Sequence, residues 1–248
     1  MTVPAPGRPG RSGPARPADV PGPSDDEGWA EVLPVKGGDG AKSRLAAGAG
    51  AALDIALDCL DAVLGCPEVD RAVVVTAHPP TARAVGLAGA PVVPESRPGA
   101  GLVAAVRDGL AALAGSPGPC AVLLADLPAL RPGDLGAALR AAQAALRRTG
   151  GPAAVFVPDA EGTGTVLLAA GSAAAIRPAF GPGSAAAHAL AGAARLDLDL
   201  PRLRRDVDTA GDLRTAAVLG LGRRTAARFR TGDAARHRSG DGARRPGG

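Results

Sequence analysis

The sequence predicts an α/β fold: a single Rossmann-like domain with a mostly parallel sheet. Short, continuous apolar runs alternate with longer Ala- and Leu-rich segments. This is the pattern of buried parallel strands connected by helices. The length of 248 residues, of which 46% are hydrophobic and 21% charged, suits one sizeable soluble domain.

Each element follows from a local pattern. Leucines recur at helical spacing from Leu53 to Leu64, and two apolar runs around a Gly-rich turn at 162–165 predict a strand pair. Strands are expected at 29–35, 71–77, 90–95, 120–126, 153–159, 165–170 and 195–200. Helices are expected at 50–64, at 102–115, from about 132 onward, at 184–193 and at 209–220.

The two ends of the chain differ from its body. Residues 1–28 and 223–248 are rich in Pro, Gly or Arg and poor in large apolar residues, so we expect disordered tails around one domain at 29–222. The net charge of +4 belongs to the C-terminal end, where eight Arg and two Asp follow Leu221, whereas 1–28 sum to −1. The body is therefore close to −1, which argues against a nucleic-acid-binding surface.

The sequence lacks several common motifs for nucleotide binding, catalysis, secretion and membrane insertion. Residues 36–43 and 48–53 lack the glycines of a P-loop and of a dinucleotide fingerprint. The three histidines form no catalytic constellation, and the three cysteines contain no C-x-x-C pair, which is typical of a reducing cytosol. No signal-peptide core and no run of about 20 apolar residues occur, so a cytoplasmic protein without a membrane span is expected.

Residues that follow strands are the candidates for chemistry, because ligands of open α/β sheets bind beyond the carboxyl ends of the strands. After the first strand, Lys36, Lys42, Ser43 and Arg44 stand among glycines. They form either a triphosphate-binding loop or a basic surface loop. The Gly-rich turns at 162–165 and 180–184 carry hydroxyls and suit an anion, but each is also consistent with a plain loop.

Three aspartates suit a divalent metal ion. Asp126 closes the strand at 120–126, where it either holds a cation or caps the next turn. Asp206 and Asp208 are two residues apart, so in an extended segment both carboxylates face the same way. The alternative is a helix start with Asp208 or Thr209 as N-cap, which is compatible with a metal-binding role for Asp206.

Five segments taken in order (AKSRL, LLADLPAL, PDAEGTGT, AFGPGS and RRDVDTAGDL) resemble the phosphoenolpyruvate / 2-phospho-L-lactate guanylyltransferase family. The resemblance covers about 29–222. It implies the glycosyltransferase-A-like nucleotidyltransferase fold and a cytosolic, Mg²⁺-dependent enzyme of coenzyme F-420 biosynthesis. In that reaction GMP passes from GTP to phosphoenolpyruvate or 2-phospho-L-lactate and pyrophosphate is released. With phosphoenolpyruvate the product is enolpyruvoyl-2-diphospho-5'-guanosine.

The resemblance also implies roles for individual residues. The metal-binding acids fall on Asp126, Asp206 and Asp208, and Lys42 and Arg44 match a segment that faces the nucleotide phosphates. The phosphoacid contacts fall on Thr165, Gly181 and Ser184. Two alternatives remain: a nucleotidyltransferase of the same fold that acts on a molybdenum cofactor or a sugar phosphate, or a non-catalytic nucleotide- or RNA-binding module.

Overall fold

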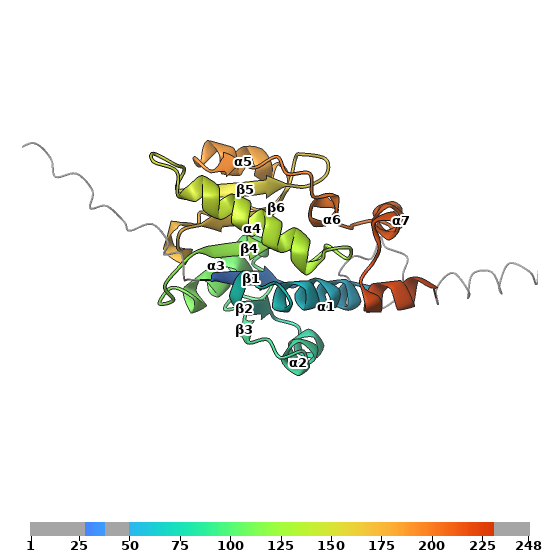
Figure 1. Cartoon of the computed structure of the whole chain (residues 1–248). Helices are drawn as coiled ribbons and strands as arrows, with labels where there is room; N and C mark the ends of the chain where they lie inside the picture. The colour runs from blue at the N-terminus through green and yellow to red at the C-terminus, as the bar shows by residue number, and fades with distance from the viewer. Residues whose placement is uncertain (1–27, 38–49, 231–248) are drawn as a thin grey trace, which may run out of the picture.

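The structure is a computed structural model that describes residues 28–37 and 50–230. Its centre is a seven-stranded sheet in the order β3-β2-β1-β4-β6-β5-β7 (Figure 1). Strand β6 runs antiparallel to both of its neighbours, and every other pairing is parallel. The predicted α/β class with a mostly parallel, mixed sheet is confirmed. The strands are β1 (Trp29–Pro34), β2 (Val69–Thr76), β3 (Val92–Pro94), β4 (Cys120–Leu123), β5 (Ala154–Pro158), β6 (Thr165–Ala170) and β7 (Ala194–Arg195).

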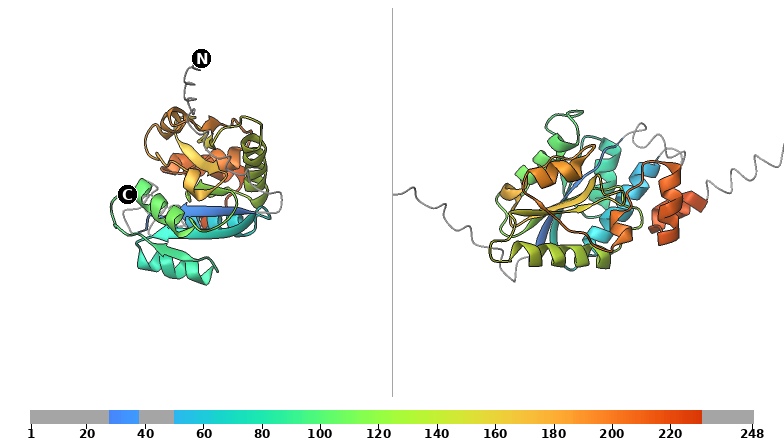
Figure 2. Two further views of the ribbon diagram at one scale, coloured as in Figure 1. Left: turned by 90° about the vertical axis from the view of Figure 1, so that its left-hand side faces the viewer. Right: turned by 90° about the horizontal axis from the view of Figure 1, so that it is seen from above.

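Helices cover both faces of this sheet, which is why its strands are continuously apolar. Apolar residues of α1 and α4 pack on one face, and those of α3 pack on the other (Figure 2). The helices are α1 (Ala51–Leu64), α2 (Pro79–Leu87), α3 (Leu102–Ala112), α4 (Pro132–Leu146), the 3-10 turn η2 (Ala173–Ala175), α5 (Ser184–Leu190), α6 (Pro201–Arg204) and α7 (Ala210–Leu219). Of the helices, α2 and η2 follow closely after β2 and β6, whereas α1, α3, α4 and α5 begin after longer connecting segments.

The antiparallel direction of β6 determines where the site forms. The parallel strands β1, β2, β3, β4 and β5 all end at the same edge of the sheet, and β6 begins at that edge because it runs the opposite way. Its first residue, Thr165, pairs with Pro158 at the end of β5. Residues from both halves of the chain therefore meet at one edge.

Several elements differ from the sequence expectation, among them α6 and the 3-10 turn η2, which no pattern predicted. Helix α2, which is absent from the expected elements, starts at Pro79, where two consecutive prolines suit the first turn of a helix. The strand expected at 195–200 is not formed: the two-residue β7 covers Ala194–Arg195, where it pairs with Val155 and Phe156 of β5, and residues 196–200 form no strand. Strand β4 ends at Leu123, three residues before Asp126.

The folded part also continues past the expected boundary at 222. Residues 223–230 are helical and contact α1, because the backbone N–H groups of Arg224 and Thr225 donate to the Asp58 carboxylate at 3.0 and 2.8 Å. Arg228 forms an ion pair with Asp54. The arginines that suggested a disordered tail here pair with the acidic side chains of α1.

Glu31 is an unusual residue in the centre of the sheet. It lies on β1 with no solvent exposure, and neither carboxylate oxygen has a hydrogen-bond partner within the described ranges. Burial raises the pKa of this carboxyl to about 8. Glu31 is therefore neutral near pH 7, since a charged form without a partner is disfavoured in an apolar interior.

Within 28–37 and 50–230, no helix is long and apolar enough to cross a membrane.

Candidate active site

The acidic residues predicted to bind metal come from two segments joined by a backbone contact. The N–H of Val207 donates to the carbonyl of Asp126 at 3.1 Å, and the Val207 side chain is fully buried. Because Val207 points into the core, its neighbours on either side face outward together. Asp206 is half-buried and Asp208 is exposed.

Negative charge accumulates around Asp206. Burial raises the pKa of its carboxyl to about 7, and the nearby charges of Asp126 and Asp159 add to the increase. Asp208 acts in the same direction to a smaller extent. A carboxylate whose neighbours are also carboxylates gains its ionised form when a cation binds among them.

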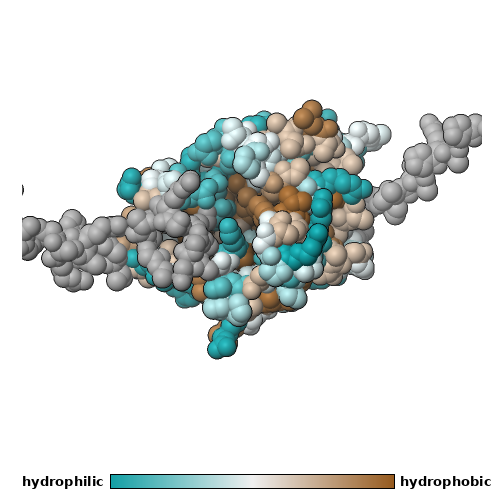
Figure 3. Space-filling view, turned by 180° about the vertical axis from the view of Figure 1, so that it is seen from behind, coloured by the Kyte–Doolittle hydropathy of each residue, from teal (hydrophilic) through white to brown (hydrophobic). Residues whose placement is uncertain are grey.

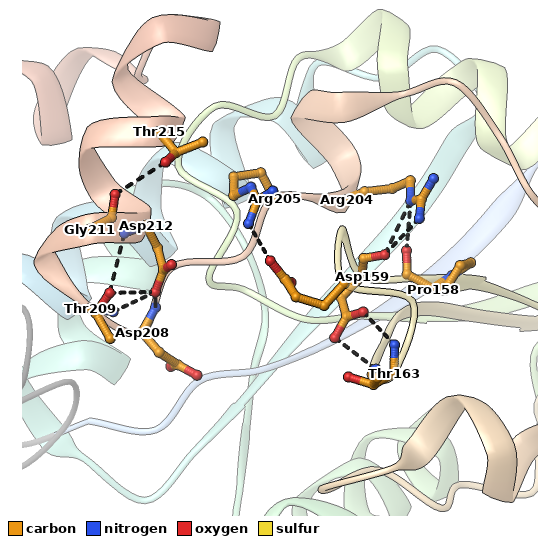
Figure 4. Close-up of polar contacts among 12 residues, drawn as sticks. Pro158, Asp159, Thr163, Arg204, Arg205, Asp208, Thr209, Gly211, Asp212 and Thr215 are labelled. Atoms are coloured by element: carbon orange, nitrogen blue, oxygen red, sulfur yellow. Dashed lines mark hydrogen bonds and ion pairs between the residues drawn. The ribbon is translucent and has the colours of Figure 1, made fainter.

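A second acidic group shares Asp206. Carboxylate oxygens of Asp159, Glu161 and Asp206 lie within 4.8 Å of one another, and neither Asp159 nor Glu161 belonged to the predicted set. Both have structural partners as well (Figure 4). Asp159 accepts from the N–H groups of Thr163 and Gly164 at 2.9 and 2.7 Å, and Glu161 pairs with Arg205 at 2.6 Å. These contacts hold the loop between β5 and β6 in place.

Helix α7 begins at Ala210, two residues after Asp208. Thr209 is its N-cap and forms a capping box with Asp212, so its hydroxyl accepts from the Asp212 N–H while the Asp212 carboxylate accepts from the Thr209 N–H. Of the two alternatives for the cap, the structure selects Thr209. The Asp208 side chain is therefore not needed to start the helix.

A cavity of about 770 Å³ opens at the carboxyl ends of β1, β2, β3 and β4. Lys36, Glu95, Asp126 and Asp208 are its charged lining residues, and its apolar wall includes Leu102 and Leu124. Figure 3 shows apolar side chains in a hollow between hydrophilic residues on the face turned away from the viewer of Figure 1. The volume is within the usual range for a small-molecule site.

The predicted phosphoacid residues lie beside this cavity and do not line it. Thr165 begins β6 and Ser184 begins α5, and their exposed fractions are 2% and 3%. The two turns are joined because the N–H of Ala185 donates to the Thr163 carbonyl at 3.1 Å. Gly181 has a φ of 138°, which a residue with a side chain rarely adopts. The structure thus brings Thr165, Gly181 and Ser184 into one region.

Lys42 and Arg44, the predicted phosphate-contacting cations, lie outside the described residues. No motif or spacing in the sequence indicated a special role for Glu31, Glu161 or His188. Asp159 was detectable in principle, because it is the last residue of a predicted strand and precedes a Gly-rich turn.

The family model of the MobA-like NTP transferase domain matches residues 38–205. A nucleotidyl transferase structure from Methanothermobacter has the same fold, with a TM-score of 0.55 at 18% identity over 77% of this chain and 97% of that one. The protein is therefore an enzyme of the nucleotidyltransferase class, and the predicted glycosyltransferase-A-like fold is confirmed.

Sequence relatives are more specific. The phosphoenolpyruvate guanylyltransferase of Salinispora arenicola is 52% identical over 80% of this chain and 92% of its own length. That of Thermomonospora curvata is 48% identical over 80% of this chain and 87% of its own. This chain belongs to the phosphoenolpyruvate guanylyltransferase family.

Proposed function

We propose that this enzyme transfers GMP from GTP to the phosphate of phosphoenolpyruvate, or of 2-phospho-L-lactate, in the cytoplasm. The product with phosphoenolpyruvate is enolpyruvoyl-2-diphospho-5'-guanosine, an intermediate for coenzyme F-420. The single observation that carries the proposal is the placement of Asp126, Asp206 and Asp208. Asp126 and Asp208 line a cavity large enough for a nucleotide, and their charges act on the neighbouring Asp206 carboxyl.

The cavity is the proposed nucleotide site. It spans the ends of four adjacent strands, a width of about 14 Å from β3 to β4 at ordinary strand spacing, which suits a nucleoside with its α-phosphate. Lys36 lines the cavity on the β1 side. Lys42 and Arg44 follow in the sequence, and we assign them to the triphosphate.

Asp126, Asp206 and Asp208 fit a divalent ion by their chemistry. All three offer carboxylate oxygens, the donors that Mg²⁺ prefers. Burial first, and then the charges of Asp126 and Asp159, raise the pKa of Asp206 to about 7, and a cation would compensate that negative charge. Mg²⁺ held there would neutralise the phosphate charge that builds up in the transition state.

The reaction needs no general base from the protein. The phosphate oxygen of the acid is already ionised at neutral pH. It forms a bond to the α-phosphorus of GTP while the bond from that phosphorus to the bridging oxygen breaks, and pyrophosphate leaves. The work of the chain is to bring two polyanions together in line, with the acid held by Thr165, Gly181 and Ser184.

Pyrophosphate release tests this proposal. Purified enzyme with GTP and Mg²⁺ should release pyrophosphate only when phosphoenolpyruvate or 2-phospho-L-lactate is added. Release that requires a sugar phosphate or a molybdenum cofactor precursor would assign the enzyme to another acceptor. Salt-dependent RNA binding without any GTP turnover would indicate a binding module.

A further inference from the structure

His188 links the two turns of the proposed acid site. It lies on α5 with no solvent exposure, and its Nδ1 is 2.9 Å from the hydroxyl of Thr165. Its Nε2 accepts from the backbone N–H of Ala179 at 3.0 Å. The ring also packs edge-on against Phe180, with centroids 5.0 Å apart. One imidazole therefore contacts both the start of β6 and the segment that leads into Gly181.

These contacts determine where the proton of the imidazole resides. A backbone N–H can only donate, so Nε2 must carry a lone pair and Nδ1 must carry the hydrogen. The ring is neutral in this arrangement, and its burial lowers the pKa of His188, which favours the same form. Nδ1–H consequently donates to the Thr165 oxygen.

The direction of that bond has a consequence for Thr165. Its oxygen is occupied as an acceptor, and no second protein partner for the hydroxyl exists among the described residues. We infer that His188 is a positioning residue that holds the Thr165 hydroxyl as a hydrogen-bond donor toward an anionic oxygen of the phosphoacid. The identity of the ligand in this inference rests on the proposed function. The tautomer of His188 follows from its hydrogen bonds alone.

The tautomer can be measured without turnover. Proton–nitrogen correlation spectra of the histidine rings, with His188 assigned by its loss in His188→Gln, should show Nδ1 protonated and Nε2 unprotonated. The signal should stay unchanged from pH 6 to 8. An Nε2-protonated ring, or a ring that becomes cationic in this range, would overturn the inference whether or not the enzyme uses phosphoenolpyruvate.

Two substitutions separate positioning from packing. In His188→Asn the amide N–H can replace Nδ1–H, whereas in His188→Gln the amide oxygen can replace Nε2 and the donation to Thr165 is lost. We expect His188→Gln to raise the Michaelis constant for phosphoenolpyruvate roughly tenfold. His188→Asn should change it less, and neither should change the constant for GTP. If both Michaelis constants rise equally, and the rise parallels the fall in melting temperature, His188 serves only to pack the core.

A double substitution tests the route through Thr165. Thr165→Val removes the hydroxyl but keeps the shape. If His188 acts through that hydroxyl, His188→Gln should raise the constant for phosphoenolpyruvate no further in the Thr165→Val background. Additive effects would show that His188 reaches the acid by another route and would overturn the inference. If neither protein turns over any phosphoacid, the proposed function fails, and the ring spectrum still decides the tautomer.

Discussion

The backbone N–H of Val207 donates to the carbonyl of Asp126 across 81 positions of sequence, at 3.1 Å. This bond joins the residues that follow β4 to the segment that precedes α7. Because Val207 is buried, Asp206 and Asp208 are presented on the same side as the residues that follow β4. For this reason we propose that Asp126, Asp206 and Asp208 bind the same divalent ion.

Replacing any one of the three acids should strongly reduce turnover. Asp126→Asn, Asp206→Asn and Asp208→Asn each keep the shape but remove a charge that a divalent ion needs. We expect a loss of at least about 2.7 kcal/mol of transition-state stabilisation, a hundredfold in rate. The double change at Asp206 and Asp208 should cost far less than the sum of the single ones, because the ligands act together.

The control is Asp199→Asn, which removes an exposed carboxylate. Asp199 neither lines the cavity nor belongs to the acidic groups around Asp206. Its turnover should equal that of the wild type. If Asp206→Asn and Asp208→Asn remain nearly as active, with unchanged dependence on Mg²⁺, the segment serves only to start α7.

Ser184→Ala should raise the Michaelis constant for the phosphoacid more than that for GTP. The hydroxyl lies in the turn beside Thr165 and away from the cavity lining, so its loss should affect the acid alone. Steady-state kinetics with each substrate varied will measure this, with Ser172→Ala, beyond the far end of β6, as control. A larger effect on GTP would move this turn to the nucleotide side.

The stability of the protein should fall as the pH rises from about 5 to 8. Glu31 has a pKa near 8 in the folded state and an ordinary value of 4.5 when unfolded, so the folded state holds the proton more tightly. The contribution of Glu31 to the free energy of unfolding is complete below pH 4.5 and is lost as the pH approaches 8. The amide in Glu31→Gln cannot ionise, so this variant should gain on the order of a few kcal/mol relative to wild type at pH 8.

Denaturant unfolding followed by the fluorescence of Trp29, the single tryptophan, measures this effect. Equal pH profiles for wild type and Glu31→Gln would mean that Glu31 is not the residue that titrates.

Two truncations should behave differently. Removing 1–27 and 231–248 should leave the melting temperature and turnover nearly unchanged, as the composition of these segments predicts. Ending the chain at Gly222 also removes the donors to Asp58 and the packing of Phe229 against the small cluster formed by α1, α7 and Val207. We expect this shorter chain to melt several degrees lower, since about 1 kcal/mol corresponds to 2–4 °C at this size. Thermal unfolding of the two truncated chains measures the difference. Equal melting temperatures would contradict the packing role of 223–230.

The sequence was most informative where one local pattern sufficed. The continuous apolar strands predicted the parallel half of the sheet, and the strand-end position of Asp126 predicted an acid at its carboxyl edge. The buried state of Glu31 was not predictable, because a single Glu in a strand usually faces water. The role of His188 was not predictable either, because its partners Thr165 and Ala179 come from other segments and only the fold brings them together.

Transfer of label from GTP tests the central claim most directly. With α-phosphorus-labelled GTP, Mg²⁺ and phosphoenolpyruvate, the label should appear in a single new compound whose two phosphorus atoms are coupled in a phosphorus spectrum, in equal amount to the pyrophosphate released. Label that stays in GTP, or appears only as GMP or GDP whether or not phosphoenolpyruvate is present, would contradict the proposed transfer of GMP to a phosphoacid.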